Sequence, residues 1–553
     1  MKEKVLFEVI YHSTINIAEE MSIALRQTAF SPNIRDRRDL SCAILSENGE
    51  LVAQAENIPV HLGSMAVGTK NAVEYLSKES ISLEPSDIII LNDPYIAGTH
   101  LNDIMLLAPI YAGEKLIGYI ANKAHHVDVG GKVPGSMGGA TNLYDEGIVI
   151  LPTKVVKKGE VDMELIKSLA SKVRTPYYLK GDIMAQIAAI NTGLKRIGEL
   201  LEKYGWKTLV ESWNWSINYA EKYIRSVISN LPHTTVSAQD YIEAGDELFN
   251  IDVSIGIDDR VTVDFSGTHS QVDYPINAVY GVTVSSSLYA LKSVLDPDMP
   301  MNYGFYNVIS IYAPEGSIVN PIKPAPVSLG NVETSQRIVD VILKALADIL
   351  PGKIPAASHG SMNNVMIGGV YDGVKWAFYE TIGGGSGGRP FSDGIDGIHT
   401  NMTNTLNTPV EVIEREYPIL ILEYSLRKDS CGAGKYRGGL GITRKYRLLR
   451  GKAKVSIATS RVKTSPWGVK GGKDGEPGYH YVVRSSGEII RLSNIDNIDI
   501  IEGDVIVINT PGGGGYGNPK DRDKIDILND IMDEKISLEY ATKYYNFNLE
   551  EPW

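Results

Sequence analysis

Residues 105–126 read MLLAPIYAGEKLIGYIANKAHH. Two apolar runs lie on either side of Gly113 and Glu114. Short apolar runs bounded by turn residues are typical of β-strands. We therefore predict two adjacent strands here, and the polar residues at their ends, such as His125, should come close together.

The residues before this stretch predict a helix and further strands. From Val5 to about Phe30, apolar residues recur at helical spacing, which predicts one long amphipathic helix ending before Pro32. Residues 40–54, LSCAILSENGELVAQ, predict a hairpin. Asn48-Gly49 favours a type I′ turn, because that turn needs positive φ at both central positions. DIIILND (87–93) adds another strand.

The remaining residues alternate between helical and β character. Residues 161–230 carry helical patterns, with Gly205 as a stop signal, and the character changes to β after Leu231-Pro232. Residues 246–268 predict two strands joined at 258–259. Helices are expected at 285–295 and 335–350, glycine-rich strands at about 360–515, and two short helices around 535–537.

A chain of 553 residues is long enough for more than one hydrophobic core. The expected fold class is α+β: a large, mixed, multi-layer protein with long helices and several antiparallel sheets. We predict three domains. They are a metal-bearing α+β domain with a helical segment at 1–230, a β-rich, glycine-containing domain at 231–519, and a C-terminal helical tail at 520–553.

Composition excludes several classes of protein. A formal net charge of −13 and a pI near 5.4 argue against nucleic-acid binding, which needs a basic face. Two cysteines are too few for a disulfide framework, so an intracellular, cytoplasmic location is expected. No stretch approaches about 18 continuous apolar residues, so no membrane association is expected.

Histidines and aspartates gather between positions 39 and 128. Four of the ten histidines fall between 61 and 126. The residues in question are His61, His100, His125, His126, Asp39, Asp93, Asp103 and Asp128. Imidazole and carboxylate together suit a divalent cation. Neighbouring side chains of a strand point to opposite faces, so only one of His125 and His126 should contribute. The alternative, that each histidine caps a turn or pairs with an aspartate, stays open.

Other motifs give weaker signals. The runs 383–388 and 512–517 both satisfy G-x-G-x-x-G, but neither opens a helix, so no dinucleotide site is predicted. Gly434-Lys435 lacks the rest of a P-loop, so no ATP site is predicted on this chain. Cys42 should be a buried apolar residue and Cys431 should be exposed, and neither is favoured as a nucleophile.

Ten short motifs in order make the chain resemble the hydantoinase B/5-oxoprolinase C-terminal family, which includes N-methylhydantoinase B-type subunits and subunits of acetone and acetophenone carboxylases. They are RDLSCA (38–43), IPVHLG (58–63), GTHLND (98–103), HHVDVGG (125–131), PGS (134–136), GDIMAQ (181–186), VDFSGT (263–268), YETIGGG (379–385), NTPVE (407–411) and KYRGG (435–439). The resemblance covers nearly the whole chain. Residues 172–176, KVRTP, and 429–432, DSCG, depart from the pattern of many relatives, which puts substrate identity in question.

The resemblance implies a metal-containing subunit that works beside a hydantoinase A-type ATP-binding subunit in a hetero-oligomer. It implies a divalent metal (Zn, Mn or Fe) here and ATP on the partner. The implied metal ligands are Asp39, His100, Asp103 and His125. His126, Asp128 and Glu146 are the candidate catalytic residues, and His61 is a candidate for the second shell or for substrate contact.

The first functional expectation is an ATP-dependent cyclic amidase that hydrolyses a phosphate-activated lactam or hydantoin, such as 5-oxoproline. The alternative is a subunit of an ATP-dependent ketone carboxylase, in which a phosphorylated enol meets CO2 at the same metal. A third possibility is a scaffold that only stabilises its ATPase partner. It would keep turnover after His100→Ala, whereas either enzyme would lose it.

Overall fold

The computed structural model describes residues 2–55, 57–299 and 301–548. Contacts group the chain into two compact units: residues 1–236 with 253–331, and residues 237–252 with 332–553. These units differ from the predicted ranges, because residues 253–331 group with the N-terminal part and the tail groups with the β-rich part. As separate domains, 1–230, 231–519 and 520–553 stay a prediction.

An antiparallel sheet of seven strands forms the first unit's centre, in the order β2-β1-β5-β4-β3-β6-β7. The strands are β1 (Leu40–Ser46), β2 (Leu51–Gln54), β3 (Ile88–Leu91), β4 (Asp103–Ala112), β5 (Lys115–His125), β6 (Thr153–Lys157) and β7 (Glu160–Val161). β4 and β5 are the predicted pair, joined at Gly113-Glu114. Their placement inside the sheet explains why most residues of both strands are buried.

The turn between β1 and β2 differs from the predicted type I′ turn. Among the described residues, Gly49 has a positive φ of 73°, but Asn48 does not have one. Gly49 N–H donates to Ser46 O over 2.9 Å, and Ser46 N–H donates to Glu50 O over 2.8 Å. This is the pattern of a three-residue loop that ends on a left-handed glycine, so this turn needs a positive φ only at Gly49.

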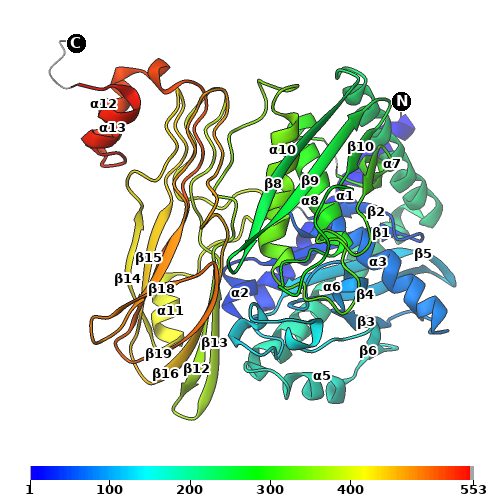
Figure 1. Cartoon of the computed structure of the whole chain (residues 1–553). Coiled ribbons are helices and arrows are strands. Elements are labelled where there is room, and N and C mark those ends of the chain that lie inside the picture. Colours follow the sequence, from blue (N-terminus) through cyan, green and yellow to red (C-terminus); the bar gives the residue numbers. More distant parts are fainter. Residues whose placement is uncertain (1, 56, 300, 549–553) are drawn as a thin grey trace. The chain divides into compact units, whose positions relative to one another are not determined.

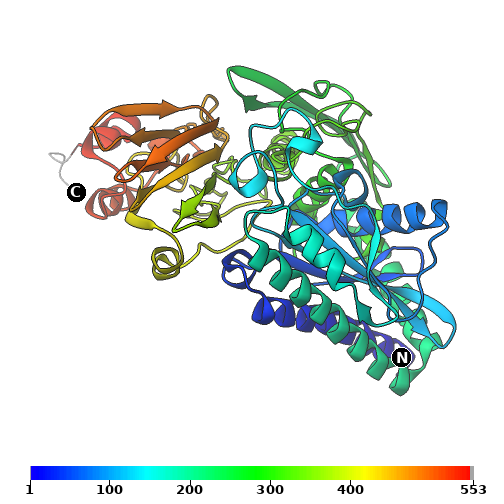
Figure 2. The same cartoon turned by 90° about the horizontal axis from the view of Figure 1, so that it is seen from below.

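Helices cover both faces of this sheet (Figures 1 and 2). They are α1 (Lys2–Thr28), α6 (Pro176–Tyr204) and α7 (Trp206–Ile228) on one side, and α3 (His61–Lys78) with α8 (Tyr280–Leu295) on the other. α1 lies along α6, which packs on β4 and β5. No helix within the described residues is long and apolar enough to cross a membrane.

The two faces of β5 have different neighbours. Tyr119 and Ala121 belong to the core that contains Met65 of α3. Ile120 lies on the other face, where its side chain approaches Gly193 of α6. Because side chains alternate along a strand, His125 lies on the α3 face.

A second sheet has the order β11-β10-β9-β8. Its strands are β8 (Thr234–Ala244), β9 (Glu247–Ile257), β10 (Val261–Asp264) and β11 (Ile309–Tyr312). β9 and β10 are the two strands predicted around residues 258–259. The outer part of the β8–β9 hairpin, residues 237–252, belongs to the second unit.

The second unit contains two further antiparallel sheets, in the orders β13-β12-β16-β19 and β14-β15-β20-β17-β18. The strands are β12 (Asn364–Tyr371), β13 (Val374–Glu380), β14 (Ile419–Leu426), β15 (Ile442–Leu448), β16 (Lys452–Ala458), β17 (Tyr479–Val483), β18 (Ile489–Leu492), β19 (Ile495–Ile501) and β20 (Val505–Asn509). One apolar core includes residues of both sheets and of α11 (Val410–Glu416). With α10 (Ser335–Leu346), these elements confirm the α+β class.

The C-terminal residues form α12 (Lys524–Met532) and α13 (Leu538–Tyr545), as predicted. They pack over a cluster that contains Cys431, so the prediction that Cys431 is exposed is wrong. Burial raises the pKa of the Cys431 thiol to about 11, which removes it as a ready nucleophile. Cys42 is buried in β1, as predicted.

The glycine-rich runs allow close backbone packing. A Cβ at Gly385 would lie 1.9 Å from the Gly439 carbonyl oxygen, and one at Gly513 would lie 2.0 Å from the Ser386 carbonyl oxygen. Only glycine tolerates such approaches. The first run leads into no helix, and the second is followed only by the three-residue 3₁₀ helix η4 (Pro519–Asp521).

Candidate metal centre

Three neighbouring strand ends bring acidic and imidazole groups together. Asp103 begins β4 and is paired in register with His125, which ends β5. β1 pairs with β5 on its other side, so Asp39, just before β1, lies next to His125. The His125 N–H donates to the Asp39 carbonyl oxygen over 3.0 Å. The antiparallel register therefore aligns three residues that are far apart in the sequence.

His100 reaches the same place from a tight turn. α4 (Pro94–Ala97) ends at Gly98, whose φ of 83° lies in the left-handed region. The chain then turns, and Asp103 N–H donates to the His100 carbonyl oxygen over 3.1 Å. The Ala-Gly-Thr step before His100 is thus the bend that places its ring beside Asp103.

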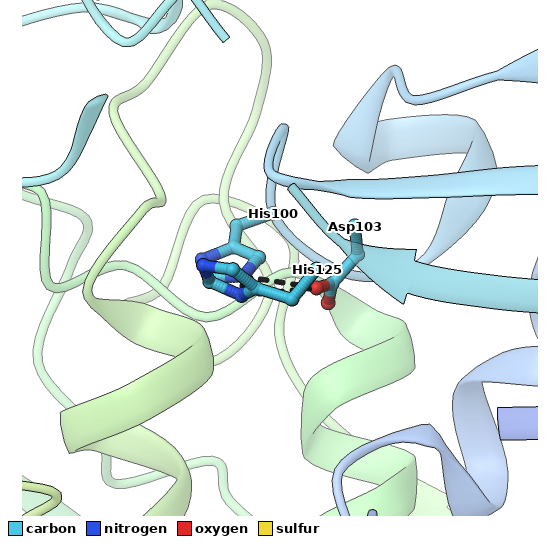
Figure 3. Close-up of side chains that lie close together, drawn as sticks. All are labelled: His100, Asp103 and His125. Carbon is cyan, nitrogen blue, oxygen red and sulfur yellow. Dashed lines mark hydrogen bonds and ion pairs between the residues drawn. The ribbon is translucent and has the colours of Figure 1, made fainter. Parts of the chain in front are cut away.

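The three side chains converge (Figure 3). His100 Nε2 lies 3.2 Å from Asp103 Oδ1 and 3.2 Å from His125 Nδ1. His125 Nδ1 lies 3.4 Å from the same Asp103 oxygen and 3.8 Å from Asp39 Oδ2. One ligand atom from each of His100, Asp103 and His125 lies within 4.8 Å of the others, and all three residues are buried.

The hydrogen bonds of His100 define its neutral form. Its Nδ1 donates to the Ser328 carbonyl oxygen over 2.9 Å, so in the neutral ring the lone pair is on Nε2. That lone pair faces the Asp103 carboxylate. His100 Nε2 and Asp103 Oδ1 are both acceptors, so at 3.2 Å they need a shared proton or a cation between them. Two imidazole nitrogens and a carboxylate oxygen form a donor set that suits zinc, manganese or iron.

The electrostatics of the cluster favour a charged pair of His100 and Asp103. Burial favours the neutral ring of His100, but the facing Asp103 carboxylate outweighs burial and raises the pKa of His100. Burial opposes ionisation of Asp103, yet His100 and His61 hold its pKa well below its usual range. Burial lowers the pKa of His125. Asp103 is therefore ionised and His125 neutral near pH 7, the forms in which both bind metals.

His61 supports Asp103 from the start of α3. Its Nε2 lies 3.2 Å from Asp103 Oδ2, and its Nδ1 lies 2.9 Å from the Ser41 hydroxyl. Asn331 Nδ2 also donates to Asp103 Oδ2, over 3.4 Å. These contacts leave the other carboxylate oxygen, Oδ1, facing His100 and His125. Asp103 is thus oriented by its surroundings, as metal ligands commonly are.

Lys123 is a buried residue near the cluster that the sequence analysis missed. It lies two residues before His125, on the same face of β5. Its ammonium group donates to Ala97 O over 2.7 Å and to the Ser64 hydroxyl over 3.1 Å. Burial lowers the pKa of Lys123 to about 7. Strand alternation from His125 could have identified it, but lysine ordinarily predicts a solvent-exposed position.

The three predicted catalytic residues lie outside the cluster of His100, Asp103 and His125. His126 is on the opposite face of β5, with Nε2 3.0 Å from Gln186 Oε1 of α6. Asp128 accepts from Arg174 Nη1 over 2.8 Å and from backbone amides of its own loop. Glu146 accepts from two backbone amides. Their catalytic roles stay predictions.

Comparisons with known proteins give a consistent result. The family model described as hydantoinase B/oxoprolinase matches residues 3–519. An uncharacterized protein of Methanocaldococcus jannaschii is 58% identical over 99% of this chain and 96% of its own length. The 5-oxoprolinase of Dictyostelium discoideum is 34% identical over 93% of this chain, which spans only 40% of that protein.

Two solved structures have the same fold. The ATP-dependent caprolactamase of Pseudomonas jessenii superimposes with a TM-score of 0.92 at 25% identity, over 99% of this chain and 97% of that chain. A nucleotide-free acetone carboxylase superimposes with a TM-score of 0.90 at 18% identity, over 98% of this chain and 79% of that chain. The second likeness concerns the fold alone.

Proposed function

Because this chain belongs to the hydantoinase B/oxoprolinase family, we propose that it is the metal-containing subunit of an ATP-dependent cyclic amidase. The substrate class is a lactam or hydantoin whose amide oxygen is activated by phosphorylation. One observation carries the proposal: the buried convergence of His100, Asp103 and His125. A buried set of ligand groups that shift one another's pKa values is typical of a reaction centre.

The proposed metal ligands are His100, Asp103 and His125, with Asp39 as the fourth. A divalent cation held there would supply Lewis acidity, which polarises a carbonyl group or makes water a stronger nucleophile near pH 7. The protein's own contribution is orientation. His61 and Asn331 hold one oxygen of Asp103, while the Ser328 carbonyl holds His100.

His126 is proposed to support the site from the opposite face of β5, where it contacts Gln186 of α6. Its Nε2 is engaged by Gln186, and its Nδ1 has no hydrogen-bond partner among the described residues. Burial lowers the pKa of His126, so the ring is neutral near pH 7. Asp128, held by Arg174, is expected to shape the following loop.

We propose that a hydantoinase A-type partner supplies ATP binding. Two observations support this. The sequence contains no complete P-loop motif, and the chain spans only 40% of a 5-oxoprolinase that it matches. Phosphoryl transfer from ATP to the amide oxygen on the partner would release ADP and make the carbon electrophilic. Water would then add to that carbon, the C–N bond would break to open the ring, and phosphate would leave. The two free, buried cysteines agree with a cytoplasmic setting.

The test is to co-purify this chain with its ATP-binding partner and to measure ATP hydrolysis with three substrate sets: 5-oxoproline and hydantoin, caprolactam, and ketones with bicarbonate. We expect ATP hydrolysis and ring opening with a cyclic amide. Activity only with a ketone and bicarbonate would replace the amidase with the carboxylase alternative. No ATP hydrolysis with any set would contradict both.

A further inference from the structure

Glu146 holds a chain segment that comes from a distant part of the sequence. It follows the short 3₁₀ helix η2 (Leu143–Asp145), and its side chain is buried, with the residue 1% exposed. Its Oε1 accepts from the backbone amides of Val327 and Ser328, both over 2.8 Å. One oxygen therefore fixes two successive peptide units of a segment that lies in neither a helix nor a strand.

That segment in turn holds His100. The Ser328 carbonyl oxygen accepts the Nδ1–H of His100 over 2.9 Å. This bond keeps the hydrogen on Nδ1 and directs Nε2 toward Asp103 and His125. Glu146, the Ser328 peptide and His100 thus form one continuous chain of hydrogen bonds. Such outer contacts commonly set the tautomer and ring orientation of a ligand histidine.

We propose that Glu146 is a positioning residue: it fixes the Ser328 carbonyl and, through it, the tautomer and orientation of His100. This inference deepens the proposed function, because it assigns Glu146 to the metal centre through contacts with the protein alone. It requires only an acceptor oxygen at the right reach, and it requires no charge on Glu146.

One observation supports contact through a single oxygen, and a second supports a neutral carboxyl group. Glu146 Oε2 has no hydrogen-bond partner among the described residues, so Oε1 alone makes the contacts described. Burial raises the pKa of Glu146 to about 8, so the carboxyl group is largely neutral at pH 7. Glutamine has an acceptor oxygen at the same reach and no charge, whereas aspartate keeps the carboxyl group but is one methylene shorter.

The experiment compares Glu146→Gln, Glu146→Asp and Glu146→Ala with the wild type as full-length chains. Glu164→Gln is the control, because its side chain is 85% exposed. The first readout is the ¹⁵N chemical shifts of the His100 ring in metal-free protein, recorded above the raised pKa of His100, where the ring is neutral, and assigned by their loss in His100→Asn. The second is Zn²⁺ affinity, measured by competition with a chelator.

We expect the wild type, Glu146→Gln and Glu164→Gln to show Nδ1-protonated His100 and similar Zn²⁺ affinity. Glu146→Asp and Glu146→Ala should lose the single tautomer and bind Zn²⁺ about 10–100-fold more weakly. If Glu146→Ala does not fold, the comparison of Glu146→Gln with Glu146→Asp tests the proposal instead. Wild-type behaviour of Glu146→Asp together with loss in Glu146→Gln would overturn the proposal, as would wild-type behaviour of a folded Glu146→Ala.

These outcomes are separate from those of the proposed function. The His100 tautomer and Zn²⁺ affinity are measured on this chain without partner, ATP or substrate. A protein that turns over no cyclic amide could still show the predicted order of variants. Conversely, an active amidase whose Glu146→Ala variant keeps the wild-type tautomer would keep the proposed function and reject the role of Glu146.

Discussion

His125 and His126 are neighbours in the sequence but have different surroundings. His125 faces Asp103 and His100, whereas His126 faces Gln186 of α6. Strand alternation predicts this separation from the sequence alone. The contacts of Ser328 and Asn331 could not be predicted in the same way. They lie more than two hundred residues from His100 and Asp103, and no local pattern brings them together.

The first prediction concerns Asp103, which carries the charge at the centre of the cluster. Asp103→Asn keeps the shape of the side chain but removes the carboxylate that faces both imidazoles. We expect Zn²⁺ affinity to fall by more than the factor of about 10–100 that the loss of an outer contact causes. Chelator competition with metal analysis measures this.

The control is His233→Asn, because the His233 side chain is 61% exposed and pairs with Asp258 rather than with the cluster. It should bind Zn²⁺ like the wild type. Equal Zn²⁺ content in the wild type and in folded Asp103→Asn would show that the cluster is not the metal site.

At the scale of elements, the site depends on the register of β4 with β5 and on the turn before His100. The apolar runs and Gly113-Glu114 predict the strand pair correctly. The β1–β2 turn was predicted as type I′, but one left-handed glycine closes it. Dipeptide preference could not distinguish the two, because both turns place Gly49 at a positive φ. Helix α8 packs closely on the other turn, the one before His100, so that Gly281 of α8 lies in contact with Gly98.

Two glycine substitutions test this packing. A Cβ at Gly281 would lie 2.4 Å from the Gly98 carbonyl oxygen, so Gly281→Ala should destabilise the first unit by about 1–3 kcal/mol. A Cβ at Gly198 of α6 would have no atom within 4 Å, so Gly198→Ala should stabilise by up to about 1 kcal/mol. The midpoint of urea unfolding measures both. A Gly281→Ala midpoint at or above the wild-type value would contradict the close packing.

At the scale of the whole molecule, the sequence predicts the α+β class and the glycine-rich β segments, but not the membership of the two units. Residues 253–331 group with the N-terminal part through long-range contacts, such as those of α3 with α8. The β8–β9 hairpin contributes residues 237–252 to the second unit. There Asp240 bonds Arg461 over 2.7 Å and Arg337 over 3.4 Å, in a buried ionic network.

Asp240 should stabilise the second unit in a pH-dependent way. Burial opposes its ionisation, but Arg461 and Arg337 hold the pKa of Asp240 below its usual value. A lowered folded-state pKa gives stability that is present above about pH 4 and is lost as pH falls. At pH 7, Asp240→Asn should cost about 3–5 kcal/mol, because it removes one of the two buried carboxylates, Asp240 and Asp340, that balance the buried guanidinium groups of Arg337 and Arg461.

Melting temperatures at several pH values check this. The difference between wild type and Asp240→Asn should be largest near pH 7 and shrink progressively as pH falls below about 4. Asp246→Asn, on the same hairpin, removes an exposed pair with Lys463 and should change the melting temperature little. A difference that stays constant from pH 7 to pH 3 would contradict the assigned role of Asp240.

The most direct test of the central claim is cyclic-amide turnover by the complex of this chain with its ATP-binding partner, measured for wild type, His100→Asn and His233→Asn at equal complex concentration. A reaction centre at His100, Asp103 and His125 predicts that His100→Asn forms the complex but loses ring opening, while His233→Asn retains it. Undiminished ring opening by an intact His100→Asn complex would contradict the claim and favour a scaffold role for this chain.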